Sequence, residues 1–413
     1  MIKCEDAYQY LLLLCIYAIF TITAVKFDGY KIDEFTNHVP LMQAMEKDGY
    51  FATIFSDKYE AANTPLPYLI AYVPLKVFGI PFSIGLLRVV NALISLCTIL
   101  VLLNILSLYK IRLSFLIVIT VLFYPYFLKP SFSYYMAVYG VLFYLLTIRA
   151  ILSDWKSKWI LAGLSLTGAV LSQQFYLVII PGVLAFMYWY NNQNKRELLI
   201  NATLVTLPII LFTLPLFFFW GGLTHSDYSF HKISFDVTKV TSILVIAGGL
   251  FIPYVLFNYK DYLSKKSIIY VLMGFVFMEW FAPVFAAMGA FGAITGYTWH
   301  AVEILGKIHP LLKTTSGAIL FSFCLFSFFD LLKKIDDRLD FIFILSLIFF
   351  LGGFLINEVL MERHLLPLAV IVLVLSLRKI SSSVLLFLTA IFYLLFGSSY
   401  FWYYLYVHDT FKH

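Results

Sequence analysis

The sequence predicts an all-α, polytopic membrane protein, and three observations support this class. Of the 413 residues, 62% are hydrophobic and only 13% are charged, whereas soluble domains are about half apolar and about a quarter charged. The mean hydropathy is +0.90. Apolar runs that approach the roughly 20 residues needed to cross a bilayer recur along the whole chain. One water-soluble core cannot bury this much apolar surface, so lipid must be the solvent for most of it.

The charge balance fits the same class. Lysine and arginine exceed acidic residues by 29 to 23, for a net charge of +6. Because no basic run is longer than a pair, the sequence excludes nucleic acid as a partner. Basic loops instead set the orientation of membrane proteins. The 4 cysteines form no CxxC or Cys/His spacing, so we expect free thiols and no Cys/His metal site.

The apolar runs predict about 13 membrane spans, with the N-terminus inside and the C-terminus outside. The first run lacks a small-residue cleavage site and is read as a retained span. The chain is therefore expected to form a single transmembrane domain over residues 1–413. The predicted spans are 8–27, 82–108, 113–128, 134–151, 159–175, 176–190, 198–219, 240–258, 267–288, 311–332, 339–356, 364–377 and 383–403.

The polar segments between these spans alternate between two kinds. The plain basic segments are assigned to the cytoplasm by the positive-inside rule; they are 109–112, 154–158, 191–197, 258–266, 333–338 and 378–379. The other segments are richer in His, Asp, Glu, Gly and Tyr and fall on the opposite side; they are 28–64, 128–134, 220–239, 289–310 and 356–364.

Residues 28–81 form the predicted first external loop. Within it, Pro65–Phe78 is apolar but short and holds three prolines. We read this stretch as a helix at the outer interface, with Lys76 reaching the headgroups.

The same loop carries the strongest candidate for catalysis. Asp33 and Glu34 follow the first span closely, and His38 comes four residues later. A carboxylate there can act as general base on a hydroxyl. The alternative is an N-cap for a helix predicted at Val39–Lys47.

A second external cluster lies after the span that ends near Trp220. It contains His225, Asp227, His231 and Lys232, which can bind a phosphate or a sugar. A solvated loop is the commoner role of such residues. Their spacing matches no standard metal site, so no metal is predicted.

The third group consists of cations near the outer ends of spans. Arg363, followed by His364, can pair bidentately with a lipid phosphate; the alternatives are an interfacial anchor or an ion pair with Glu358. Arg88 and Lys129 fall near the same face and are further phosphate candidates.

Glu279 lies near the middle of a predicted span. An intramembrane acid is costly and often functional, but a hydrogen bond to a neighbouring helix explains it equally well. No role is assigned to it.

The layout resembles the C-type (GT-C) membrane glycosyltransferases. In that class an acidic residue in the first external loop acts as base and interfacial helices follow it. The stretch NTPLPYLIAYVPLKVFGIPFSIGLLRVVNAL and the later ERHLLPL are similar to segments of those enzymes. The resemblance implies the GT-C fold.

Within the class, the chain is most similar to the endoplasmic-reticulum dolichyl-phosphate-glucose α-1,2-glucosyltransferases. Their Asp-Glu-x-Phe-His-x-Pro-Gln-Ala-Gln signature reads here DEFTNHVPLMQA, and their Gly-Asp-x-Ser-x-His reads Asp227-Tyr-Ser-Phe-His231. One extra residue precedes His38, Leu41 replaces a glutamine, and a family Arg-Gln pair is Gln173-Gln174.

The resemblance implies an inverting transfer of a hexose, with glucose as the family's sugar, from a polyprenyl-phosphate carrier to a lipid-linked or surface glycan. Asp33 is the expected base and Glu34 orients it or the acceptor. Arg363 and one of Lys129, Lys232 or His231 stabilise the leaving phosphate. No cofactor is expected. Composition favours a bacterial plasma membrane with an outward-facing site; an endoplasmic-reticulum membrane with a lumenal site is the alternative.

Two other functions remain open at this stage. A flippase or transporter of lipid-linked sugars shares the spans and scattered charges, but it predicts broken helices in corresponding halves. A glycan polymerase or ligase differs in its donor, which is a diphosphate-linked oligosaccharide.

Overall fold

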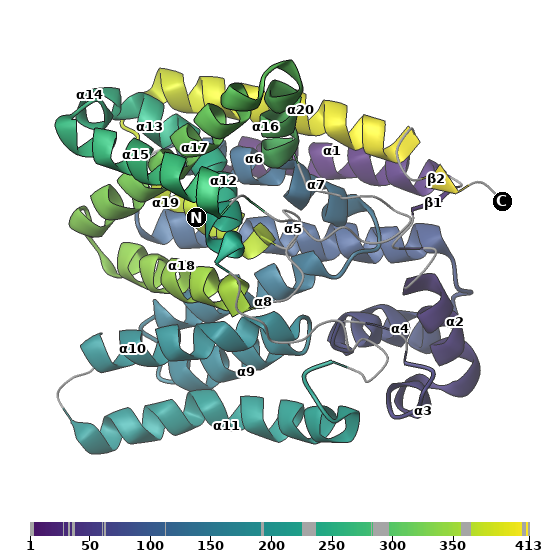
Figure 1. The fold of residues 1–413 in the computed structure, drawn as a ribbon. Coiled ribbons are helices and arrows are strands. Elements are labelled where there is room, and N and C mark those ends of the chain that lie inside the picture. The colour runs from purple at the N-terminus through teal and green to yellow at the C-terminus, as the bar shows by residue number, and fades with distance from the viewer. Residues whose placement is uncertain are drawn as a thin grey trace. The chain divides into compact units, whose positions relative to one another are not determined.

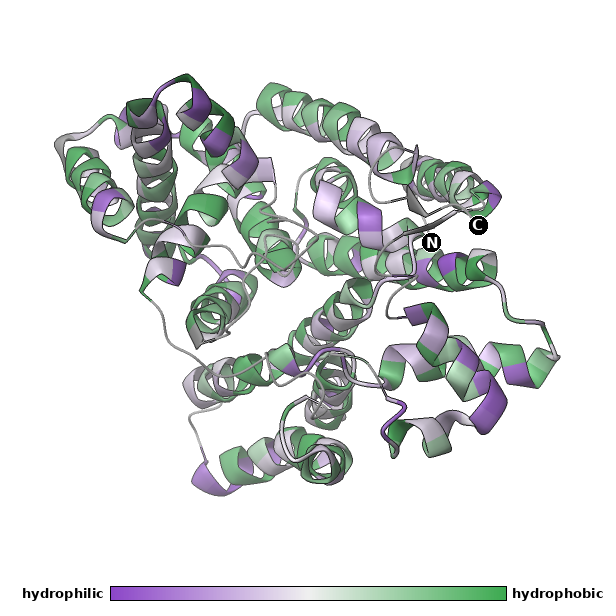
Figure 2. Ribbon diagram, turned by 45° about the vertical axis from the view of Figure 1, so that its right-hand side comes forward, coloured by the Kyte–Doolittle hydropathy of each residue, from purple (hydrophilic) through white to green (hydrophobic). Residues whose placement is uncertain are grey.

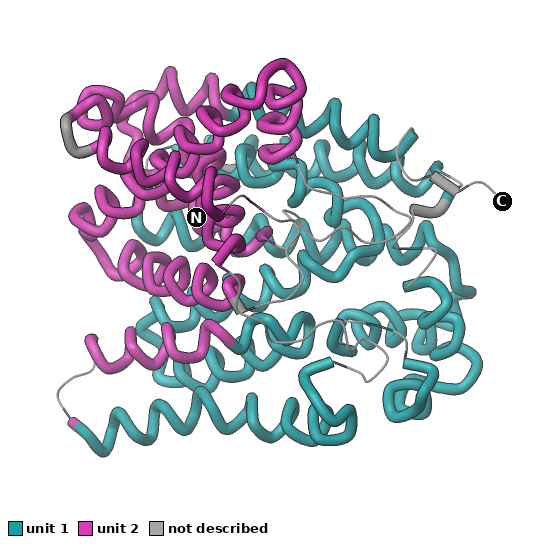
Figure 3. Tube along the Cα trace, viewed as in Figure 1, with its two compact units in different colours: residues 1–177, 195–229, 390–413 teal, residues 178–194, 230–389 magenta. Residues whose placement is uncertain are grey.

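The computed structural model is almost wholly helical. It describes residues 4–27, 29–31, 34, 38–59, 61, 63–111, 113–190, 194–224, 237–281, 283, 297–356, 365–406 and 410–411. The chain divides into two compact units, which interleave along the sequence and are described separately (Figures 1 and 3).

Unit 1 comprises residues 1–177, 195–229 and 390–413. Its helices begin with the first predicted span and include those of the first loop. They are α1 (Cys4–Lys26), α2 (Val39–Asp48), α3 (Tyr50–Ile54), α4 (Leu66–Phe78), α5 (Ile84–Leu108), α6 (Ser114–Leu122), α7 (Pro125–Phe132), α8 (Ala137–Ile151), α9 (Lys158–Val170), α11 (Lys195–Trp220) and the part of α20 (Ser383–Tyr406) from Ala390 onward.

The helices of unit 1 pack in a row in which α1 contacts α5, α5 contacts α8, α8 contacts α9 and α9 contacts α11 (Figure 1). Gly163 allows the last pair to approach closely. A Cβ atom at this position would lie 2.5 Å from the main-chain oxygen of Leu204 on α11. Small residues at helix crossings are the usual means of close packing between membrane helices, because lipid provides no hydrophobic force between them.

A two-stranded pairing in unit 1 joins the segment after α1 to the segment after α20. Strand β1 (Tyr30–Lys31) pairs antiparallel with β2 (Thr410–Phe411), so that Tyr30 lies opposite Phe411. Helix α20 packs on α1, where the ring centroids of Phe20 and Phe401 are 5.1 Å apart. The C-terminal segment therefore lies against the start of the first loop.

Unit 2 comprises residues 178–194 and 230–389. Helix α17 is its centre and contacts α12, α15 and α16. The helices of unit 2 are α10 (Ile180–Tyr190), α12 (Thr238–Leu250), α13 (Ile252–Phe257), α14 (Tyr259–Tyr262), α15 (Lys265–Trp280), α16 (Tyr297–Ile308), α17 (Pro310–Lys333), α18 (Arg338–Ile356), α19 (Leu366–Leu377) and the start of α20. The 3₁₀ helix η2 (Gln174–Ile179) crosses the division between the units.

The membrane class is confirmed, but only about half of the predicted spans are. Figure 2 shows that apolar residues dominate most helices. Among the described residues, 6 helices are long and apolar enough to cross a membrane, or 7 if α6 and α7, which are bent by 68° at their junction, form one span. Each remaining predicted span contains a shorter helix. The 12-residue α19 rises about 18 Å, less than the ~30 Å hydrocarbon core.

Two predicted helices of the first loop are confirmed. The helix expected at Val39–Lys47 is α2, and the one expected at Pro65–Phe78 is α4. The Lys76 ammonium donates to the Glu46 carbonyl at 3.3 Å and so links α4 to α2. That α4 lies at the membrane interface stays a prediction.

The placement expected for Glu279 is different in the structure. This residue lies in the last turn of α15, which ends at Trp280, and its side chain is exposed. The predicted span 267–288 runs past that point into residues outside the described ones. Glu279 is therefore a helix-end residue.

The close approach of α12 to α17 makes a testable prediction at Gly248. A Cβ atom there would lie 1.8 Å from the main-chain oxygen of Leu320, whereas one at Gly352 on α18 would meet nothing within 4 Å. We expect Gly248→Ala to destabilise the protein by about 1–3 kcal/mol and Gly352→Ala to leave it unchanged or slightly more stable. Thermal unfolding of both variants in one detergent measures this. Equal unfolding temperatures would contradict the close packing of α12 on α17.

Candidate functional site

A buried ion pair joins Glu34 in the first loop to Arg88 on α5. The Arg88 Nε donates to Glu34 Oε1 at 3.0 Å and Nη2 donates to Oε2 at 2.7 Å. Each side chain is only 1% exposed. Two parallel N–H···O bonds of this kind combine strength with a fixed mutual orientation. One of the two acidic residues predicted for catalysis is thus anchored inside the protein.

The rest of the Arg88 guanidinium holds the end of α1. Nη1 donates to the carbonyls of Ala24 at 2.8 Å and Phe27 at 2.7 Å, and Nη2 donates to the carbonyl of Gly29 at 2.7 Å. Carbonyls at a helix C-terminus lack partners within the helix, and a cation there is favoured by the helix dipole.

This arrangement gives Arg88 a structural role, while the phosphate role predicted for it stays a prediction. A guanidinium has five N–H donors, and the contacts to Glu34, Ala24, Phe27 and Gly29 engage all of them. The sequence showed a cation near the end of a span but not the carboxylate and carbonyls that surround it. Arg88 is therefore a positioning residue for the first loop.

Glu34 is held from a third direction. Its Oε1 also accepts a hydrogen bond from the backbone N–H of Tyr134 at 2.8 Å. Glu34 thereby connects the first loop with α5 and with the segment that links α7 to α8. Because both carboxylate oxygens accept hydrogen bonds from buried donors, Glu34 is suited to positioning its neighbours. A role as general base finds no support in this geometry.

Asn91 lies one turn beyond Arg88 on α5 and holds the same link. Its amide nitrogen lies within 3.0 Å of the carbonyls of Pro130, Ser133 and Tyr135. Its amide oxygen accepts from the Tyr139 hydroxyl at 2.8 Å. The chain reversal between α7 and α8 therefore depends on one buried side chain of α5.

A chain of hydroxyl groups continues this polar face. Ser95 lies 2.7 Å from the Tyr17 hydroxyl on α1 and donates to the Ser131 hydroxyl at 2.6 Å. Ser131 in turn donates to the carbonyl of Phe127 at 2.6 Å. These bonds tie α1, α5 and α7 together in the interior of unit 1.

Arg88, Asn91 and Ser95 form what we call the polar stripe of α5. The spacing of three and four residues places them on one face of a helix. Sequence reasoning did not identify the stripe as a unit. Its signal was present in the sequence, since three polar residues recur at helical spacing in an otherwise apolar span.

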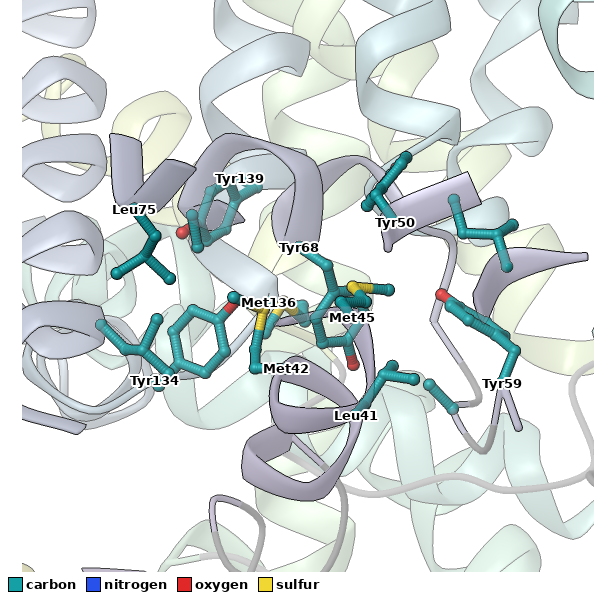
Figure 4. Close-up of a cluster of buried hydrophobic side chains, with 14 of the residues drawn as sticks. Leu41, Met42, Met45, Tyr50, Tyr59, Tyr68, Leu75, Tyr134, Met136 and Tyr139 are labelled. Atoms are coloured by element: carbon teal, nitrogen blue, oxygen red, sulfur yellow. The ribbon is translucent and has the colours of Figure 1, made fainter. Parts of the chain in front are cut away.

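His38 belongs to an aromatic cluster beside this stripe. Its Nδ1 lies 2.8 Å from the Tyr68 hydroxyl, and its ring packs edge-on against Tyr134 and Tyr135. Figure 4 shows Tyr68 and Tyr134 among the methionines Met42, Met45 and Met136. The Tyr134 side chain is fully buried, and its hydroxyl has no hydrogen-bond partner among the described residues. The residues of the DEFTNH segment that the structure describes are thus buried.

Lys129 has an aromatic neighbour. It lies on α7, and its ammonium is 4.1 Å from the centre of the Tyr404 ring on α20. A cation over an aromatic face gains electrostatic stabilisation. The side chain is partly exposed, so its predicted phosphate role stays a prediction.

Seven predicted site residues lie outside the described part of the chain, and their roles stay predictions; they are Asp33, His225, Asp227, His231, Lys232, Arg363 and His364. Among the described residues, no group of three or more His, Cys, Asp or Glu side chains is arranged to hold a metal ion. Of the predicted site, the structure brings together Glu34, Arg88 and His38.

Comparison with protein-family models, with curated proteins and with solved structures found no match for this chain. The candidate site is therefore defined by its own geometry.

The buried ion pair makes a second prediction. Arg88→Met leaves the Glu34 carboxylate buried without its cation, which costs about 3–5 kcal/mol. Lys58→Met is the matched control, because Lys58 pairs with Asp48 at 2.7 Å on the surface, where ion pairs contribute little. We expect a large fall in the unfolding temperature in detergent for the first variant only.

The double variant Arg88→Met/Glu34→Leu should recover part of that loss, since it removes the unpaired charge. If Arg88→Met and Lys58→Met unfold at the same temperature, the ion pair does not hold unit 1 together.

Proposed function

We propose that the chain is an inverting, membrane-embedded glycosyltransferase that uses a polyprenyl-phosphate hexose as donor. The observation that carries the proposal is the buried Glu34–Arg88 ion pair. It holds Glu34 of the Asp33-Glu34 motif inside a rigid, buried polar centre. In a solvated loop both residues of the motif would instead be in water. Glu34, His38 and Arg88 belong to two of the segments that carry the resemblance, and they make buried contacts with specific partners.

In the proposed reaction, Asp33 takes the proton of an acceptor hydroxyl. The hydroxyl oxygen attacks the anomeric carbon, and the bond from that carbon to the phosphate oxygen breaks with inversion. The polyprenyl phosphate leaves with the electron pair of that bond. Glu34 keeps the motif in place, while Arg363 and one of Lys129, Lys232 or His231 stabilise the charge that grows on the phosphate. The residues require no cofactor or metal for this role.

The proposed fold is GT-C with about 13 spans. The shorter helices α8, α9, α10, α12, α15 and α19 would count as spans. Helices α8 and α19 are almost entirely buried, so protein rather than lipid surrounds them. A helix enclosed by protein can be shorter than the hydrocarbon core and still form part of a span. We propose a bacterial plasma membrane with the site facing outward, or an endoplasmic-reticulum membrane with a lumenal site.

A flippase of lipid-linked sugars is the second candidate, and the junction of α6 and α7 favours it. The two helices meet at 68°, and α7 begins at Pro125. Broken helices that line substrate paths are typical of transporters.

A transfer assay separates the two functions. The purified protein receives radiolabelled polyprenyl-phosphate glucose and a mixture of lipid-linked glycans. We expect label to reach an acceptor with the wild type, and Asp33→Asn to slow transfer by at least about 100-fold because the general base is lost. Asp57→Asn is the control, since Asp57 is an exposed carboxylate of the same loop, and it should transfer at the wild-type rate.

Three results would contradict the proposal. Transfer by Asp33→Asn at the wild-type rate would show that Asp33 is not the general base. No transfer by any variant, together with movement of the donor across liposomes, would assign the chain to the flippase. Transfer from a diphosphate-linked oligosaccharide alone would indicate a polymerase or ligase.

A further inference from the structure

A cavity of about 210 Å³ lies where α14 ends and α15 begins, within unit 2; Figure 1 labels the two helices. Its polar end is formed by Ser264 and Ser267, and its apolar end by Ile268, Val271 and Leu272. A cavity that is polar at a helix start and apolar along the next turns has the two-part character of a lipid site.

The hydroxyl of Ser267 is the feature that points to a ligand. The residue is only 4% exposed and lines the cavity, yet its Oγ has no hydrogen-bond partner among the described residues. A buried polar group without a partner costs about 1–3 kcal/mol, so each one in a native protein needs an explanation.

Other helical hydroxyls of this protein solve the same problem differently. Thr98, Thr120, Thr147 and Ser172 each donate to the carbonyl four residues earlier. Thr241, Ser327 and Ser346 are also buried without a partner, but they do not line the cavity. Ser267 is thus an unpartnered hydroxyl with space in front of it.

The helix start supplies the complementary charge. Ser264 is the N-cap of α15, and its side chain makes no capping hydrogen bond. The N–H groups of the first turn and the helix dipole favour an anion at this end. Lys260 is exposed on α14, four residues before Ser264 in the chain, and the sequence of this segment has the further lysines Lys265 and Lys266 against a single acid, Asp261.

The apolar wall is fixed by α17. The Tyr262 hydroxyl lies 2.7 Å from the Ser322 hydroxyl, and its ring packs edge-on against Phe323 at 5.1 Å between centroids. On the other side, Ile268 and Leu272 are each 59% exposed. Tyr262, which is held by α17, and the two exposed aliphatic side chains make a groove open at the protein surface.

We propose that this cavity binds an anionic phospholipid, with the phosphate at the start of α15 and one acyl chain along Ile268 and Leu272. The unpaired Ser267 hydroxyl donates to a phosphate oxygen, and Lys260 contributes charge. Basic pockets beside membrane helices are known to hold anionic headgroups on the cytoplasmic side. The predicted orientation places residues 258–266 on that side. The site is independent of the proposed transferase activity.

Native mass spectrometry of the full chain tests the proposal, with phosphatidylglycerol and phosphatidylcholine as probes. We expect the wild type to retain phosphatidylglycerol preferentially. Lys260→Gln should lower its occupancy about fivefold, the worth of one basic residue near an anionic headgroup. Lys195→Gln is the control, because Lys195 is an exposed lysine at the start of another helix.

The apolar half of the site has its own matched pair. Leu272→Trp fills the groove, whereas Ile269→Trp alters a residue of α15 that is 58% exposed but does not line it. Both are surface changes that leave the fold intact. Phosphatidylglycerol binding should fall with Leu272→Trp and with Ser267→Ala, and persist with Ile269→Trp.

Three outcomes would overturn the proposal. Equal retention of both lipids by the wild type would show that the site does not select an anionic headgroup. Equal binding of phosphatidylglycerol by Leu272→Trp and Ile269→Trp would show that the lipid does not occupy the groove. A dimer that is lost only with Leu272→Trp would assign the surface to a second copy of the chain.

Discussion

The buried ion pair between Arg88 and Glu34 is the constraint on which unit 1 depends. Charges removed from water cost several kcal/mol each unless their partners compensate. Here the guanidinium engages all five donors and the carboxylate accepts from three N–H groups. The partners come from the end of α1, the first loop, α5 and the link before α8. Moving any of these elements would leave a charge unpaired, so the pair fixes their arrangement.

The polar stripe of α5 also joins elements of unit 1 through buried polar contacts. In a membrane protein the hydrophobic effect does not drive helices together, so packing and internal hydrogen bonds must. Asn91 holds the link between α7 and α8, and Ser95 joins α1 to α7 through hydroxyls. Because Gly163 has no side chain, α9 can pack directly against the backbone of α11. Specific polar contacts and close crossings together define the unit.

The sequence predicted the class, the order of the longer helices and two of the three helices of the first loop, because these follow from local hydropathy and from proline and glycine positions. The number of spans does not follow from it. An apolar run such as Leu366–Leu377 predicts a full-length span, whereas its helix has only 12 residues and is buried in protein. The role of Arg88 was also missed, since its partners lie 54 to 64 residues away along the chain.

The engagement of Glu34 divides the acidic pair into two chemical roles. A carboxylate that already accepts three hydrogen bonds, two of them from a guanidinium, is fixed in place and has its negative charge compensated. Removing it would free Arg88 inside the protein and so would disturb folding together with any activity. Asp33 is the other carboxylate of the motif and is free of that structural duty in the proposed mechanism. A change at Asp33 should therefore affect chemistry without affecting the unfolding temperature, which is the signature that separates a catalytic residue from a positioning one.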